Sequence, residues 1–267
     1  MKSGHPVPGT RVESIRLTVR TLPPGRPPLR ICHLSDLHLR RFTNRHERLA
    51  ELVAERRPDL VLLTGDVIMQ GDRSPGTAAK LLPRLPGRHG TFACRGNAEI
   101  RRHTRPSALK AMMADCGVDL LINESRTLDT EAGTVLVSGL DDLSLGQPDF
   151  RAALEHDAPV DCSLLLAHAP LAARMVPANA EPDLMLSGHT HGGQVRIPLI
   201  WRALLPSCRG GFVAGLYEMP WGHVYVNRGF GTSRILPLRW RCPAEVAMIE
   251  LSGPEEGAAD RVSRDAT

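Results

Sequence analysis

The chain carries a series of polar side chains of the types that bind divalent metal ions. Carboxylate, amide and imidazole groups follow short aliphatic runs, and most of them stand beside a glycine. The series consists of Asp36, His38, Asp66, Asn97, His168, His189 and His191. So many mixed oxygen and nitrogen ligands exceed the needs of one ion. They indicate two divalent ions, such as Mn, Fe, Zn, Co or Mg, that share a bridging carboxylate.

The spacing within this series also favours a common site. Asp36 and His38 are two positions apart, as are His189 and His191. Alternate residues of an extended segment point the same way, so each pair is expected to present both side chains to one place. A lone Gly-Asn pair is typical of a turn, but the complete series argues against coincidence.

The order of the surrounding elements explains how residues so far apart could meet. Strands are predicted at residues 15–19, 31–34, 60–63, 91–94, 118–122, 134–137, 164–166 and 184–186, with further β structure near 224–226 and 246–249. Helices are predicted at residues 44–57, 77–85 and 106–116. Alternating strands and helices, followed mostly by strands, indicate a layered α/β fold. Ligands of such sheets lie beyond the carboxyl ends of the strands, where these polar residues fall.

Composition and charge limit the function further. The 267 residues are 42% hydrophobic and 23% charged, which suits one large globular domain. The net charge is only +4 and aromatic residues make up 4%, so a nucleic-acid partner is not favoured. No apolar run is long enough to span a membrane. Six well-spaced cysteines without a CxxC pair fit a reducing compartment. We therefore expect a cytoplasmic protein without an obligate protein partner.

The order D-x-H, GD, GN, H and GHxH resembles the calcineurin-like metallophosphoesterase superfamily. The resemblance covers residues 31–198 and extends to Glu250 through the stretches GHTHGGQVRIP and VNRGFG…LPLRWRCPAE. These two stretches are similar to a bacterial branch that includes membrane-associated phosphodiesterases and UDP-2,3-diacylglucosamine pyrophosphohydrolases of lipid A biosynthesis. The resemblance implies a four-layer α-β-β-α sandwich with two mixed β-sheets. We place this domain at residues 30–252, after an N-terminal strand and connector at 1–29 and before a polar tail at 253–267 that is expected to be disordered.

The resemblance also implies roles for the metal ligands. One ion would be bound by Asp36, His38 and His191, the other by Asn97, His168 and His189, with Asp66 bridging both. A hydroxide that bridges the two cations, with Mn favoured, would attack phosphorus in a phosphodiester or pyrophosphate. The implied substrates are lipid-linked or nucleotide-sugar phosphates such as UDP-2,3-diacylglucosamine.

Other residues are expected to complete the site. The candidate catalytic residues are Asp66, Asn97 and Glu99, and the candidate substrate ligands are Arg228 and Arg234. The segment from Pro198 to Pro206, PLIWRALLP, combines Trp, aliphatic and Arg side chains between prolines. It is expected either to touch acyl chains or the inner-membrane surface or to be buried in the core.

One position departs from the family pattern. The family usually has a histidine after Gly-Asn, whereas this chain has Ala98, followed by Glu99. That imidazole is thought to aid the leaving group or to contact the phosphoryl oxygens. Three explanations stay open: a weakly active or non-catalytic metal-binding protein, replacement by His89 or His103, or a leaving group that needs no proton. A cyclic-nucleotide or nucleic-acid phosphodiesterase is the alternative enzyme.

Overall fold

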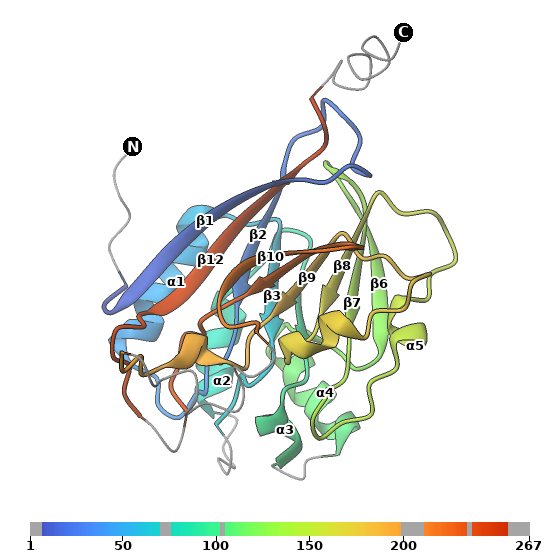
Figure 1. Cartoon of the computed structure of the whole chain (residues 1–267). Coiled ribbons are helices and arrows are strands. Elements are labelled where there is room, and N and C mark those ends of the chain that lie inside the picture. The colour runs from blue at the N-terminus through green and yellow to red at the C-terminus, as the bar shows by residue number, and fades with distance from the viewer. Residues whose placement is uncertain (1–6, 70–75, 102–104, 199–210, 234–236, 256–267) are drawn as a thin grey trace, which may run out of the picture.

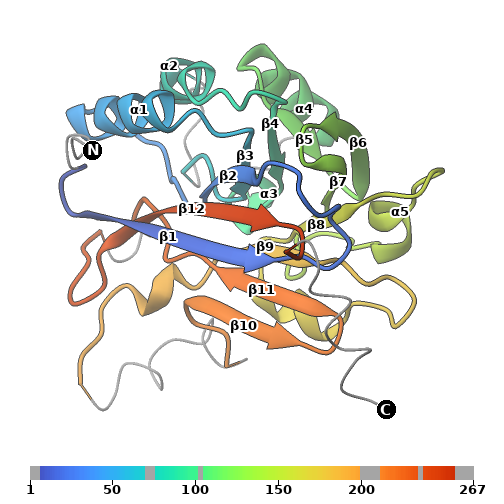
Figure 2. The ribbon, with the colours of Figure 1, turned by 90° about the horizontal axis from the view of Figure 1, so that it is seen from above.

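Two β-sheets packed face to face form the centre of the protein. The computed structural model describes residues 7–69, 76–101, 105–198, 211–233 and 237–255. Each sheet has six strands, and helices lie on the outer faces of the pair (Figures 1 and 2). This arrangement is the four-layer α-β-β-α sandwich with two mixed sheets that was predicted.

The first sheet, here sheet 1, is largely parallel. In spatial order its strands are β1 (Thr10–Thr18), β12 (Ala244–Ser252), β2 (Leu29–Leu34), β3 (Leu60–Thr64), β4 (Thr91–Cys94) and β5 (Asp119–Leu121). Strands β2 to β5 run parallel, and β12 is antiparallel to β2. Its outer face is covered by α1 (Asn44–Arg56), α2 (Gly76–Leu81), the 3₁₀ turn η1 (Leu82–Arg84) and α4 (Pro106–Asp115).

The second sheet, sheet 2, has a parallel centre between two antiparallel hairpins. In spatial order its strands are β10 (Gly215–Met219), β11 (Gly222–Val226), β9 (Leu184–Ser187), β8 (Cys162–Leu166), β7 (Gly133–Gly139) and β6 (Glu124–Thr130). The helix α5 (Phe150–Leu154) and the 3₁₀ turn η2 (Pro170–Arg174) cover its outer face.

The core between the sheets explains the aliphatic runs in the sequence. All five residues of β3 and all four of β9 are buried. Strands that are buried on both faces have continuous apolar sequences instead of alternating ones. Leu62, Leu164 and Leu186 meet in this layer. The apolar strands therefore hold the two sheets rigidly, which keeps the loops at their carboxyl ends in place.

Several elements differ from those predicted. Strand β1 pairs in parallel with β12, so residues 10–18 belong to the sandwich and the connector after them joins two strands of one sheet. Strand β6 was not predicted, because its sequence ESRTLDT is polar and it lies at a half-exposed sheet edge. The helix predicted over 77–85 becomes a 3₁₀ turn from Leu82, where Pro83 removes a backbone donor.

Two predicted segments lie largely outside the described residues. These are the apolar segment from residue 199 to 206 and the tail from residue 256 onward. In the part of the chain that the structure describes, no helix combines the length and apolar character needed to cross a bilayer.

Candidate metal centre

The predicted ligands gather where parallel strands of both sheets end. Asp36 and His38 follow β2, and Asp66 follows β3. Asn97 begins the short helix α3 (Asn97–Arg101) after β4, and His168 follows β8. After β9 come His189 and the 3₁₀ turn η3 (His191–Gly193). Carboxyl ends of parallel strands meet at one edge of a sheet, so five loops bring seven side chains together.

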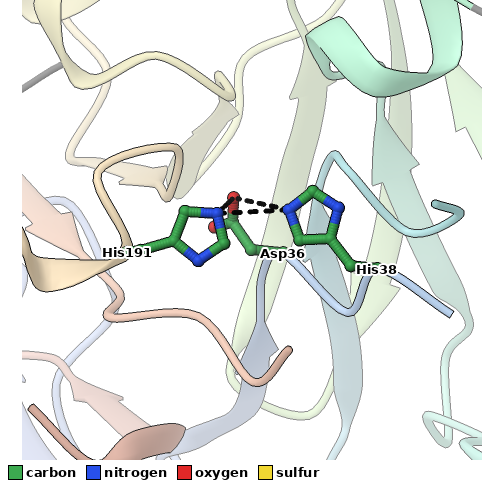
Figure 3. Close-up of side chains that lie close together, drawn as sticks. All are labelled: Asp36, His38 and His191. Carbon is green, nitrogen blue, oxygen red and sulfur yellow. Dashed lines mark hydrogen bonds and ion pairs between the residues drawn. The ribbon is translucent and has the colours of Figure 1, made fainter. Parts of the chain in front are cut away.

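The first group of ligands, half-site 1, consists of Asp36, His38 and His191. The Nε2 atoms of His38 and His191 are 3.1 Å apart, and their rings stack with centroids 5.0 Å apart. Oδ1 of Asp36 lies 3.4 Å from Nε2 of His191 and 3.9 Å from Nε2 of His38. Figure 3 shows the two rings and the carboxylate pointing at one another. The three side chains therefore surround a single point.

The second group, half-site 2, consists of Asn97, His168 and His189. Oδ1 of Asn97 lies 3.2 Å from Nε2 of His168 and 3.1 Å from Nδ1 of His189. The two imidazole nitrogens are themselves 3.1 Å apart. An amide oxygen and two ring nitrogens thus form a nearly equilateral triangle.

Asp66 lies between the two half-sites. Its Oδ2 is 3.5 Å from Nε2 of His38, and its Oδ1 is 3.5 Å from Nε2 of His168. Each carboxylate oxygen therefore faces a different half-site, which is the placement that a bridging ligand requires.

The separations and the unpaired atoms fit two divalent cations. Ligand atoms about 2.1 Å from a shared ion lie about 3.0–3.4 Å from one another, close to the separations within each half-site. Oδ1 of Asp36 is buried without a hydrogen-bond partner among the described residues. A buried carboxylate oxygen without a donor is costly, and a cation would satisfy it. The mixed nitrogen and oxygen donors suit Mn, Fe, Zn or Co.

The protonation of the histidines supports the same conclusion. Burial lowers the pKa of His38 and of His189 to about 4, and that of His191 to about 3. These three imidazoles are neutral at pH 7, and a neutral ring nitrogen is the form that binds metals. His168 differs: burial opposes its charge, but the carboxylates of Asp66 and Asp36 raise its pKa to about 9. Without a metal, its proton supplies the positive charge that these carboxylates attract.

Most of the ligands have an uncommon backbone conformation. The φ angles are 49° at Asp36, 45° at His38, 50° at Asp66, 67° at His189 and 50° at His191. Residues other than glycine rarely adopt this left-handed region, and such residues cluster at functional sites. The residues of the D-x-H and H-x-H pairs therefore reach the site through left-handed turns. The prediction that extended segments align them is wrong.

Buried hydrogen bonds hold these loops. Both oxygens of Glu99 accept backbone N–H groups: Oε2 from Gly96 at 2.9 Å and Asp66 at 3.0 Å, and Oε1 from Ile68 at 3.2 Å. Oδ2 of Asp36 accepts the N–H of His189 at 3.0 Å, which ties half-site 1 to the loop of half-site 2. Glu99 therefore positions two ligand loops instead of facing a substrate, in contrast to the catalytic role expected for it.

Glycines allow these loops to approach one another. A Cβ on Gly188 would overlap Oγ and Cβ of Ser35 and Oδ2 of Asp36, and a Cβ on Gly96 would overlap the backbone and carboxylate of Asp66. Any side chain at either position would push a ligand loop away. The glycines beside the ligands therefore belong to the construction of the site.

The comparisons with known proteins agree with this geometry. Residues 29–193 match the calcineurin-like phosphoesterase family. The chain is 31% identical to the uncharacterized metallophosphoesterase YkuE of Bacillus subtilis, over 90% of this chain and 85% of YkuE. It is 35% identical to the phosphodiesterase YaeI of Escherichia coli, over 84% of this chain and 82% of YaeI. The chain belongs to the calcineurin-like phosphoesterase family. This metallophosphoesterase is a hydrolase of a dimetal-dependent family, as its motifs predicted.

A solved structure shows the same fold. The sulfate thiohydrolase SoxB of Thermus thermophilus superposes on this metallophosphoesterase with a TM-score of 0.52. The match covers 88% of this chain and 59% of SoxB. At 11% sequence identity the likeness concerns the fold alone.

Of the two predicted substrate arginines, the structure describes only Arg228. Arg228 of this metallophosphoesterase donates to Glu13 at 2.8 Å and also pairs with Glu245, so two carboxylates hold its guanidinium. This replaces the contact with substrate phosphate that was predicted for it. Arg234 lies outside the described residues.

Arg239, which belongs to the same arginine-rich stretch of the sequence as Arg228 and Arg234, contacts the metal ligand His191. Its guanidinium donates to the carbonyls of Arg228 at 2.8 Å, Gly229 at 2.9 Å and His191 at 3.3 Å. The loop it holds packs on the residues after β2, since the N–H of Gly231 donates to the carbonyl of Asp36 at 2.7 Å. The stretch NRGFG and Arg239 thus form a backing layer for half-site 1.

We expect the substitution Glu99→Gln to destabilise the protein by about 2 kcal/mol, because an amide NH₂ would replace an oxygen that accepts buried N–H groups. Displacement of Asp66 should also weaken metal binding. Urea unfolding and metal titration test both effects. Glu181→Gln, the same change at an exposed position, is the matched control. Equal stability of the two variants would contradict the positioning role of Glu99.

Proposed function

We propose that this metallophosphoesterase hydrolyses a phosphodiester or pyrophosphate bond, and that pyrophosphates and other substrates with good leaving groups are preferred. The observation that carries the proposal is the placement of Asp66 between two triads of ligands, with one oxygen facing each. When bound, two cations supply the Lewis acidity that activates water and screens phosphoryl charge.

The residues of the chain prepare this centre for the reaction. Burial keeps His38 and His191 neutral by lowering their pKa values. The N–H of Ala98 donates to Oδ1 of Asp66 at 2.7 Å and orients that carboxylate. Ser35 donates to Oδ2 of Asp36 at 2.7 Å, which leaves Oδ1 directed at half-site 1. A preorganised charge distribution of this kind lowers the barrier without rearrangement during the reaction.

The residue after Asn97 favours particular leaving groups. Ala98 carries no proton donor and is buried, with 2% exposure. His89 does not replace it, because His89 precedes β4 whereas Asn97 follows it, and its Nε2 lies 2.9 Å from Glu131. His103 lies outside the described residues. General acid catalysis contributes about 10²–10⁴-fold, most for an alkoxide and least for a phosphate that leaves unprotonated.

The substrate class follows from this argument. A phosphoanhydride expels a phosphate monoester, which needs no proton from the enzyme, so nucleotide-sugar pyrophosphates such as UDP-2,3-diacylglucosamine are our leading candidates. The similarity of GHTHGGQVRIP to a bacterial branch that includes such pyrophosphohydrolases, beside membrane-associated phosphodiesterases, supports the choice. Turnover of this lipid, a simple nucleotide-sugar pyrophosphate and an alkyl diester by the Mn²⁺-loaded protein tests it. The proposal fails if the alkyl diester is the best substrate.

We expect Ala98→His to raise kcat/KM for an alkyl phosphodiester by about 10²-fold, because an imidazole could protonate the alkoxide. The value for a pyrophosphate should change by less than about threefold. Parallel assays of both substrates with wild type and variant measure the ratio. Ala98→Gln, which adds similar bulk but no group acidic enough to protonate an alkoxide, is the control. Equal gains for both substrates would show that leaving-group protonation is not what Ala98 lacks.

A metal-binding protein without catalytic activity is the second candidate, and Ala98 is the observation that favours it. Such a protein would bind two ions and turn over none of these substrates. Elemental analysis of the same samples separates this outcome from failure to load metal.

A further inference from the structure

A pocket opens beside half-site 1 and has its own chemical character. Its volume is about 480 Å³, and the metal ligand His38 forms part of its wall. Arg40, Arg41 and Arg45 also line it, together with Phe230, and none of the described lining residues is acidic. We call this cavity the arginine pocket. Three guanidinium groups, with no carboxylate among the described lining residues, give this cavity a positive potential.

Arg40 and Arg41 are free to contact a ligand. Both are exposed, and neither guanidinium has an ion pair or a hydrogen bond within the described part of the chain. Their backbone is nevertheless anchored, since Leu39 forms a bridge with Ile68 and Oγ1 of Thr77 donates to the carbonyl of Arg40 at 3.1 Å. The two cations therefore stand on a fixed segment directly after the D-x-H motif.

Arg45 is a partly buried cation with neutral partners. Its guanidinium donates to Oγ1 of Thr10 at 3.2 Å and to the carbonyl of Phe230 at 2.7 Å, and it lies 4.0 Å from the centre of the Phe230 ring. Burial, and then the charge of Arg239, lowers its pKa to about 10. Among the described residues Arg45 has no ion pair, and a partly desolvated cation in that state is unfavourable. An anion in the arginine pocket would relieve this cost.

The start of α1 adds to the positive potential. Thr43, the N-cap of this helix, and His46 in its first turn both line the pocket. The positive end of the helix dipole therefore faces the same space as the three arginines.

We propose that the arginine pocket binds an anionic group, a phosphate or a carboxylate, on the arm of the substrate that is not attacked. The inference rests on the proposed function, which it narrows to pyrophosphates, whose second phosphoryl group supplies the anion, and to phosphodiesters that carry an additional anionic group. The position of His38 in both the pocket and half-site 1 places such a group beside the reacting phosphorus.

The first experiment compares substrates that differ in the charged group at the end of one arm. Three p-nitrophenyl diesters of a propyl arm would end in a phosphate monoester, a hydroxyl or a trimethylammonium group. The Mn²⁺-loaded wild type should show a kcat/KM at least about tenfold higher for the phosphate-bearing arm than for the hydroxyl arm, and lowest for the cationic arm. In the Arg40→Gln/Arg41→Gln variant the three kcat/KM values should lie within about threefold of one another.

The matched control removes the same charge elsewhere. Arg20→Gln/Arg26→Gln changes two exposed arginines near the connector between β1 and β2, and it should keep the wild-type order. The Arg45→Gln variant extends the test to the partly buried cation. Its melting temperature is measured to show that the variant is folded. A wild type that does not distinguish the three arms, or a double variant that still does, would overturn the inference.

The second experiment is independent of turnover and uses inorganic phosphate. Calorimetric titration of the metal-loaded full chain should show two phosphate ions bound by wild type and by the control, and one bound by Arg40→Gln/Arg41→Gln. If the proposed function failed and no diester were hydrolysed, loss of one bound phosphate in this variant would still support an anion site. Equal stoichiometry in all three proteins would refute that site.

Discussion

Replacing Asp66 with Asn is expected to lower turnover of a chromogenic phosphodiester by at least about 10³-fold, equivalent to about 4 kcal/mol of transition-state stabilisation. Asp66 faces both half-sites, so one neutralised carboxylate affects both cations. Asn has nearly the same shape, and the N–H of Ala98 can still donate to its amide oxygen. The fold should therefore survive while metal binding weakens.

The measurement combines kcat/KM in the presence of Mn²⁺ with elemental analysis of the purified protein. Asp115→Asn, at the exposed end of α4, carries the same chemical change far from the site and should behave as wild type. An Asp66→Asn protein with two ions per chain and activity within tenfold of wild type would show that Asp66 does not bridge the ions.

Removal of metal is expected to abolish turnover and to lower the melting temperature by about 5–10 °C. An ion present at 100 times its Kd stabilises a folded protein by about 2.7 kcal/mol, and each kcal/mol shifts the melting temperature of a chain of this size by about 2–4 °C. Neutral imidazoles that converge on one point gain most from the ion, because their lone pairs have few other partners. Dialysis against a chelator, followed by addition of one metal at a time, measures both effects.

His191→Ala gives the internal comparison for this experiment. It removes a ligand of half-site 1 and leaves Asn97, His168 and His189 in place. The variant should retain part of the stabilisation by metal and lose turnover. Mn²⁺ is expected to restore the most activity to wild type. A chelator that changed neither activity nor melting temperature would contradict a metal centre at this position.

The sequence alone was sufficient to name the candidate metal ligands and to predict that they meet at one edge of the sheets. Each follows an aliphatic run that becomes a buried strand, and the carboxyl ends of parallel strands meet at one edge of a sheet. Local patterns of this kind depend on neighbouring residues in the chain. The same reasoning missed β6, because an edge strand with a half-exposed polar sequence lacks the apolar alternation that marks a strand.

The left-handed turns at Asp36 and His189 could not be read from the sequence. Aspartate and histidine occur mostly in ordinary backbone regions, and they adopt φ angles of 49° and 67° here because the surrounding loops impose them. The N–H of His189 bonds the carboxylate of Asp36 from 153 positions away. A conformation that depends on such a distant partner has no local signal.

The sequence by itself determined the family, the layered α/β architecture and the types of metal ligand, because these depend on residue identity and on periodicity along the chain. Only the tertiary structure decided what each charged side chain meets. It paired Arg228 with Glu13 and Glu245 and brought Arg45 and Arg239 to the loop at residues 228–231. Charges act through distance and burial, which are properties of the folded chain.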